Sequence, residues 1–120
     1  MEYMRYILVG ILVIIIIMRL MPARGVRHIT TADLENELQD KDKMFIDVRT
    51  KGEFNKRNIQ GFKNIPLYEL PYKTKELTTN KEIVLMCQSG TRSNKAAKIL
   101  KKKGFSKVAN VKGGMGAWSK

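Results

Sequence analysis

The chain has 120 residues, of which 43% are hydrophobic and 28% are charged, a balance typical of a globular protein and not of a disordered one. Its single Cys excludes an internal disulfide and any multi-thiolate metal site within one chain, and its single His argues against a Ser/His/Asp hydrolase. The 23 Lys and Arg residues outnumber 11 Asp and Glu residues, which gives a net charge of +12.

The excess of positive charge lies in two places. Residues 92–120 contain nine basic residues and no acidic residue, residues 1–30 contain four basic residues and one acidic residue, and residues 31–91 are neutral. This asymmetry indicates either an anionic partner or a solvated basic helix. Neither an RNA-binding aromatic signature nor zinc-finger spacing accompanies the charge, so we expect no nucleic-acid partner.

Residues 6–18 form an uncharged apolar block between Arg5 and Arg19. The block is shorter than the roughly 20 residues that cross a bilayer, but apolar residues extend it at both ends and the arginines can snorkel to the headgroups. We therefore expect a single-pass transmembrane helix that contacts the membrane over residues 4–21, within an anchor and linker of residues 1–25. A cleaved signal peptide is the main alternative, although no small-x-small site follows the block, and a buried core helix is the third.

The charges that flank the block predict its orientation. Arg19, Arg24 and Arg27 follow it, whereas Arg5 before it is partly offset by Glu2. Because the more basic side of a span favours the cytoplasm, we expect a cell-membrane protein whose soluble domain faces the cytoplasm.

Residues 26–120 alternate short apolar runs with helical patterns, as one domain. Extended segments are predicted at 27–29, 44–48, 65–67, 83–86 and 108–111, helices at 31–40, 52–55, 92–103 and 115–118, and a turn or helix interrupted by Pro71 at 68–77. A Schellman-type stop at Gly104 and Phe105 is predicted to end the helix at 92–103. Strands separated by helices predict an α/β fold with a mostly parallel sheet covered by helices on both faces.

The segment 83–93, IVLMCQSGTRS, carries the strongest indication of chemistry. A buried strand ends at Cys87, and a short polar loop then leads directly into a helix. Backbone N–H groups of this loop and the following helix dipole would surround the sulfur with positive potential, which favours the nucleophilic thiolate. Gly90 provides the conformational freedom that such a loop needs. The alternative is that Cys87 is only a small buried residue at the end of a strand.

Four segments in the same order resemble the rhodanese-like sulfurtransferases. They are CQSGTRS at 87–93, IDVR with GEF at 46–54, IQGFKNIP at 59–66 and VKGGMGAW at 111–118. Asn58 stands where many members carry His, and Gln60 replaces a frequent Pro; neither is the nucleophile. The resemblance spans roughly residues 26–120 and implies a rhodanese-like α/β domain preceded by the transmembrane helix.

The resemblance implies that Cys87 carries sulfane sulfur as a persulfide, by a ping-pong mechanism. The donor would be a small anion such as thiosulfate and the acceptor a thiol or a protein. Since no second Cys can relay the sulfur, the acceptor must be another molecule. We expect neither a metal nor a cofactor. The expected substrate-binding residues are Gln88, Ser89, Gly90, Thr91, Arg92 and Ser93, while Asp47 and Arg49 are expected to form a structural ion pair near the site.

Two other functions remain open. A membrane-tethered rhodanese-like module could use the same pocket for binding or signalling without turnover. A cysteine phosphatase or arsenate reductase is the second alternative. Only four residues separate Cys87 from Arg92, one fewer than in cysteine phosphatases, and residues 88–91 include no acid. The shorter loop suits a single sulfur better than a tetrahedral phosphoryl group.

Overall fold

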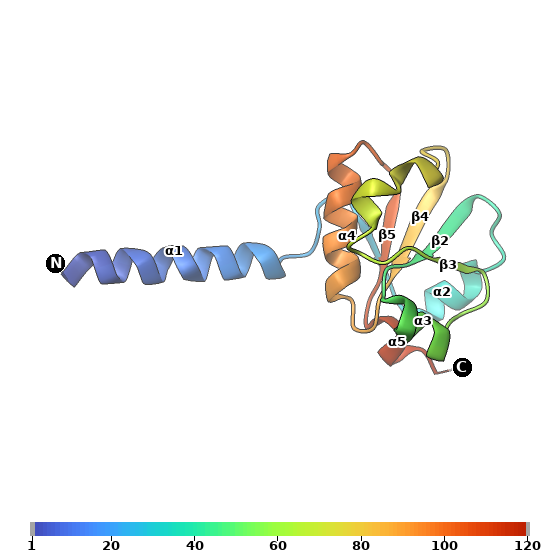
Figure 1. Cartoon of the computed structure of the whole chain (residues 1–120), viewed down its shortest axis with the longest axis horizontal. Coiled ribbons are helices and arrows are strands. Elements are labelled where there is room, and N and C mark those ends of the chain that lie inside the picture. The colour runs from blue at the N-terminus through green and yellow to red at the C-terminus, as the bar shows by residue number, and fades with distance from the viewer. Residues whose placement is uncertain (1, 120) are drawn as a thin grey trace.

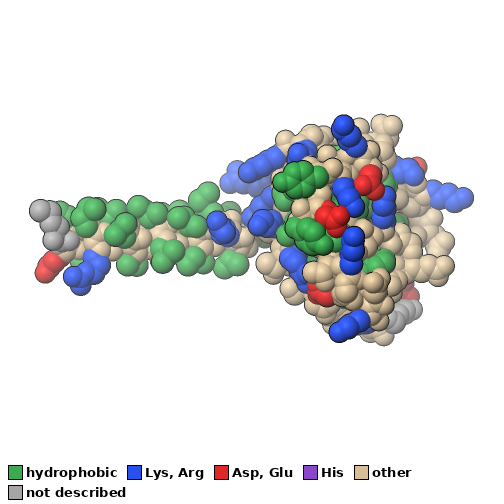
Figure 2. All heavy atoms as spheres, in the orientation of Figure 1, with side chains coloured by type: hydrophobic (Ala, Val, Ile, Leu, Met, Phe, Trp, Pro, Cys, Tyr) green, Lys and Arg blue, Asp and Glu red, His purple; other side chains and the backbone are tan. Residues whose placement is uncertain are grey.

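The computed structural model describes residues 2–119 and shows a long helix, α1 (Glu2–Leu20), that projects from an α/β domain (Figure 1). No residue of α1 is buried, and hydrophobic side chains cover the helix along its length (Figure 2). Its mean hydropathy reaches 2.1, and by length and composition it can cross a membrane. A signal sequence near an N-terminus has the same properties, so the helix is a candidate span.

The sheet of the domain is entirely parallel, and its strand order is β1-β5-β4-β2-β3. The strands are β1 (Arg27–Ile29), β2 (Lys43–Asp47), β3 (Phe62–Asn64), β4 (Glu82–Met86) and β5 (Val108–Val111). β4 lies at the centre, and its apolar residues are buried on both faces, as the continuous apolar run predicted.

Helices cover both faces of the sheet (Figure 1), and the sheet separates the core into two layers. The helices are α2 (Thr31–Glu37), α3 (Lys51–Lys56), α4 (Thr91–Lys102) and α5 (Gly114–Ala117), with short 3-10 helices η1 (Leu70–Tyr72) and η2 (Thr74–Glu76). Leu85 of the central strand and Cys87, which follows it, belong to the layer that contains α4. Val84 and Met86 belong to the layer under α2 and α5. The predicted α/β architecture is confirmed.

Local sequence signals account for the ends of the helices. Thr30 and Thr50 each begin a helix with a capping box, in which the acidic residue three positions later completes the reciprocal hydrogen bonds. After α4, Gly104 adopts a φ of +97°, and the N–H of Phe105 donates to Leu100 O at 3.0 Å. This is the predicted Schellman stop.

The segments 65–67 and 68–77 follow the predictions, whereas the strand β3 was not predicted. The strand β3 lies just before the extended segment 65–67, in which the N–H groups of Ile65 and Leu67 donate to the carbonyls of Asp47 and Val48, each at 3.0 Å. The segment thus stays extended beside the end of β2 without forming a regular ladder. The segment 68–77, predicted as a turn or helix interrupted by Pro71, contains the two 3-10 turns, and Pro71 lies in the first of them.

The linker after α1 is attached to the domain. Ala23 is buried in the core, and its N–H donates to Asn94 Oδ1 at 2.8 Å. The Asn94 amide in turn donates to Met21 O at 3.1 Å, and Lys98 Nζ donates to Met18 O at 3.3 Å. Asn94 and Lys98 belong to α4, so the end of α1 lies against the helix that follows Cys87.

Candidate active site

Cys87 lies immediately after β4, at the carboxyl edge of the sheet where parallel α/β folds place their ligands. The N–H of Gly90 donates to the Cys87 sulfur at 3.0 Å. Gly90 has a φ of +102°, a left-handed conformation that Gly adopts without a steric cost. The Cys87 loop (residues 87–91) therefore curls back over the sulfur, and Cys87 has an exposed fraction of 0%.

A chain of polar contacts runs from the sulfur into the sheet. The Ser93 hydroxyl lies 3.4 Å from the Cys87 sulfur and donates to Asn110 Oδ1 at 2.5 Å. The Asn110 amide nitrogen lies 3.3 Å from His28 Nδ1. Ser93 was expected at the site from its position in the loop motif. Asn110 and His28 were not, and the available signal was a polar Asn inside the apolar strand β5.

Backbone N–H groups of the helix α5 donate hydrogen bonds to the start of the Cys87 loop. The N–H of Met115 donates to Cys87 O at 2.8 Å, and the N–H of Gly116 donates to Gln88 O at 2.9 Å. A Cβ on Gly114 would overlap the Cys87 carbonyl, so only Gly permits this approach. The paired glycines near the C-terminus thus shape the loop as well as forming a turn.

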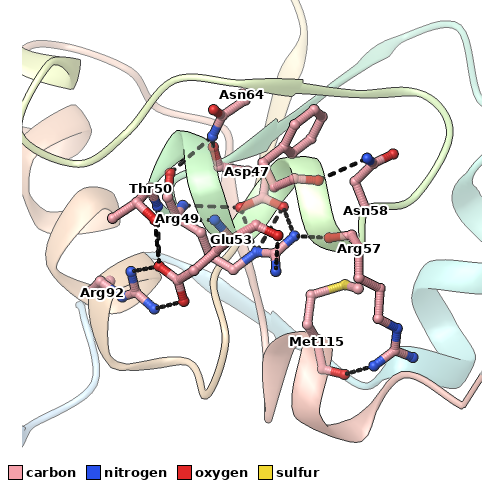
Figure 3. A network of polar contacts seen from close by, with 10 residues as sticks. Asp47, Arg49, Thr50, Glu53, Arg57, Asn58, Asn64, Arg92 and Met115 are labelled. Atoms are coloured by element: carbon pink, nitrogen blue, oxygen red, sulfur yellow. Dashed lines mark hydrogen bonds and ion pairs between the residues drawn. The ribbon is translucent and has the colours of Figure 1, made fainter.

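Arg92 pairs with Glu53 of α3. The two guanidinium nitrogens of Arg92 donate to the two carboxylate oxygens at 2.6 and 2.8 Å (Figure 3). Arg92 lowers the pKa of Glu53 from 4.5 to about 2, with smaller contributions from hydrogen bonds to Thr50. The carboxylate in turn raises the pKa of Arg92. The pair joins the segment after β2 to the first turn of α4.

Asp47 and Arg49 form a buried ion pair, with Nη2 of Arg49 2.8 Å from Asp47 Oδ2 and exposed side-chain fractions of 2% and 1%. Arg49 also donates to Arg57 O at 2.5 Å, and the Asn64 amide donates to the carbonyls of Asp47 and Arg49 (Figure 3). Asn58, one of the departures from the family pattern, donates to Phe54 O at 2.8 Å. The network fixes the chain between β2 and α3.

The remaining expected site residues lie on the surface of the loop. Gln88, Ser89 and Thr91 are exposed, and the structure brings them together around the buried Cys87. A cleft of about 410 Å³ opens beside Ser89, Gly90 and Thr91. A second, more apolar cleft of about 420 Å³ lies on the other side of α4, and Arg92 lines it.

The chain is similar in sequence to known proteins. A family model described as a rhodanese-like domain matches residues 30–120. The chain is 44% identical over 80 residues to YrkF of Bacillus subtilis, which covers 67% of this chain and 43% of that protein. It is 30% identical over 96 residues to a sulfurtransferase of Allochromatium vinosum, covering 79% of this chain and 90% of that protein.

Solved structures agree with the sequence matches. A crystal structure of a rhodanese-like domain protein from Staphylococcus aureus aligns with a TM-score of 0.73 and 34% identity, covering 78% of this chain and 92% of that one. The chain spans about half the length of the curated relatives YrkF and YqhL of Bacillus subtilis, at 43% and 58%.

Proposed function

Because the chain belongs to the rhodanese-like family, we propose that it is a sulfurtransferase that carries sulfane sulfur on Cys87. The donor is a small anion of the thiosulfate type, and the acceptor is a thiol on another molecule. The observation that carries the proposal is the Gly90 N–H at 3.0 Å from the Cys87 sulfur, inside a loop that follows the central strand.

The reaction has two steps. The Cys87 thiolate attacks the outer sulfur of thiosulfate, a sulfur–sulfur bond forms, and sulfite leaves with the electron pair of the bond that breaks. The terminal sulfur of the persulfide is anionic, and backbone N–H groups such as that of Gly90 stabilise it. An acceptor thiolate then attacks this terminal sulfur and forms its own persulfide, while the Cys87 thiolate leaves and is restored.

Access to the sulfur requires movement of the loop. Cys87 has an exposed fraction of 0%, so a donor cannot reach the sulfur in the conformation described. Gly90 and the exposed residues Ser89 and Thr91 form the part of the loop that must shift, and they already line the cleft beside it. Opening of this short segment, and not of the sheet, gives the donor its path.

A membrane-tethered binding module without turnover is the alternative within the same fold. Binding alone does not need a thiol beneath a donor N–H, so the Cys87–Gly90 contact favours the enzyme. Phosphatase or arsenate reductase activity is disfavoured by the short loop between Cys87 and Arg92 and by the pairing of Arg92 with Glu53.

We also propose that α1 anchors the protein in the cell membrane with the domain on the cytoplasmic side. The 19 residues of α1 extend about 28 Å at 1.5 Å per residue, close to the roughly 30 Å of a hydrocarbon core. Arg19 and Arg24 follow the apolar block, as the more basic side of a span should.

Intact-mass measurement after treatment with thiosulfate tests the sulfurtransferase proposal. We expect a gain of one sulfur atom, its loss on addition of cyanide, and no gain in Cys87→Ser. If wild-type protein with an accessible thiol gains no sulfur, the binding module is the better reading. The anchor is tested separately by fractionation: a wholly soluble protein trimmed near Ala23 would contradict it.

A further inference from the structure

The cleft beside the Cys87 loop is shared by three parts of the chain that are distant in sequence. The end of α1 with the edge strand β1, the Cys87 loop with the start of α4, and the end of β5 surround its volume of about 410 Å³. Its polar side chains are Arg19, His28, Ser89, Thr91, Asn94, Asn110 and Lys112. Among the described residues that line it, two are cationic and none is acidic. The cleft is therefore suited to an anion.

His28 lines this cleft and has one ring nitrogen, Nε2, without a partner among the described residues. Its Nδ1 lies 3.3 Å from the amide nitrogen of Asn110, which can only donate, so Nδ1 accepts and the neutral ring carries its proton on Nε2. In this orientation of the Asn110 amide, Oδ1 lies 2.5 Å from the Ser93 hydroxyl, which also lies 3.1 Å from Gly90 O. His28 Nε2 is buried and has no partner within residues 2–119. A buried N–H without an acceptor costs free energy, and an oxygen of a bound anion would remove that cost.

The cleft lies next to the end of α1 that joins the domain. Arg19 and Leu20 form the last residues of α1, and both line the cleft. If α1 spans a bilayer, this end of the helix lies at the depth of the lipid headgroups. Figure 2 shows Lys and Arg side chains gathered where the helix meets the domain.

We propose that this cleft binds a phosphate-type oxyanion, held by Arg19, Lys112 and the Nε2–H of His28. The same chemistry is presented by free phosphate and by the headgroup of an anionic phospholipid. Only the lipid source rests on the anchor proposed above, and neither source requires sulfur transfer. Since Ser89 and Thr91 line the cleft, an occupant would contact the segment that must shift to expose Cys87.

The single His makes a direct test possible. Full-length protein without a histidine tag, labelled with ¹⁵N in histidine and held in an uncharged maltoside detergent, gives one imidazole spectrum, that of His28. Inorganic phosphate is added in steps, and a parallel titration with chloride at the same ionic strength is the control. A second arm compares nanodiscs of phosphatidylcholine with nanodiscs that also contain phosphatidylglycerol. We expect a saturable shift of the Nε2 signal in at least one arm, also in Cys87→Ser, which separates this site from the sulfur chemistry.

A matched pair of double variants identifies the site. Arg19→Gln with Lys112→Gln should weaken the interaction by about tenfold or more, because each removes a charged hydrogen-bond donor. Arg5→Gln with Lys107→Gln removes the same charge from the opposite ends of α1 and β5 and should leave the interaction unchanged. A response to phosphate identifies the free anion, and a response to phosphatidylglycerol alone identifies the lipid. Absence of a saturable shift in both arms, or equal weakening by the two double variants, would overturn the proposal.

Discussion

The backbone nitrogen of Met115 donates to the carbonyl oxygen of Cys87 at 2.8 Å, so the last helix fixes the start of the loop that surrounds the sulfur. The approach depends on Gly114, which has a φ of +53° and no room for a Cβ beside the Cys87 carbonyl. The geometry of the Cys87 loop thus depends on α5 as well as on the residues of the loop itself.

Gly114→Ala should displace the Cys87 loop. The added methyl group overlaps backbone that cannot move alone, so we expect sulfur loading to fall by at least about tenfold and the free energy of unfolding by about 1–3 kcal/mol. Gly104→Ala is the control, because Gly104 also has a positive φ but nothing within 4 Å of its Cβ position. Intact mass after thiosulfate and thermal unfolding in detergent measure the two effects. Equal losses of sulfur loading in both variants would show that backbone strain alone is responsible.

Cys87 should react slowly with iodoacetamide in the folded protein. Its exposed fraction is 0%, so alkylation requires the loop to open first, and we expect a rate about tenfold or more below that of the unfolded chain at the same pH. Because Cys87 is the only Cys, intact mass reports this site alone. A folded protein that is alkylated as fast as a small free thiol would mean that the sulfur is open, contrary to the described loop.

Asp47→Asn should destabilise the domain strongly. It leaves the buried guanidinium of Arg49 without its counter-charge, for which we expect a loss of about 3–5 kcal/mol in the free energy of unfolding. Lys63→Gln is the control, since it removes the more exposed pair with Glu76, worth about 0–1 kcal/mol. Denaturant unfolding of full-length protein in detergent provides the comparison. Similar losses for the two variants would contradict the role assigned to the buried pair.

The pairing of Glu53 with Arg92 should make stability depend on pH in the acid range. The folded-state pKa of Glu53 is about 2 against an ordinary value of 4.5, so its stabilisation is present above pH 4.5 and is lost as pH falls toward 2. With about a third of both side chains exposed, Glu53→Gln should cost only about 1 kcal/mol at pH 7. Thermal unfolding at pH 7 and pH 3 should show the difference from wild type shrinking. A difference that is constant with pH would rule out the ion pair as its cause.

Much of the fold was predictable because the apolar periodicity of each segment and the residues that mark helix ends indicate the same element. The run at 83–86 gave the central strand, and Gly104 with Phe105 gave the end of α4. Residues 65–67 are extended and bonded to the end of β2, as predicted, but the regular pairing lies before them at β3 and stops at Asn64, and β3 was not predicted. Periodicity cannot distinguish the two situations.

The site was only partly predictable. The loop motif identified Cys87 and its neighbours, because their chemistry depends on adjacent residues. The contacts from Glu53, Asn110 and Gly114 come from elements that meet only through the order of strands in the sheet. A single sequence does not state which distant residue supplies a given contact. The polar Asn110 within an apolar strand was the one local sign that a buried partner existed.

The attachment of Ala23 and Met21 to Asn94 has a mechanical consequence. A flexible tether would let the domain tumble and sample all orientations above a bilayer. Here Met21 and Ala23 are hydrogen-bonded to the domain, so the orientation of α1 relative to the domain is restricted. If α1 is embedded in a membrane as proposed, the distance from the lipid to the Cys87 sulfur is nearly constant, and partners held in the same membrane would meet it at a defined height.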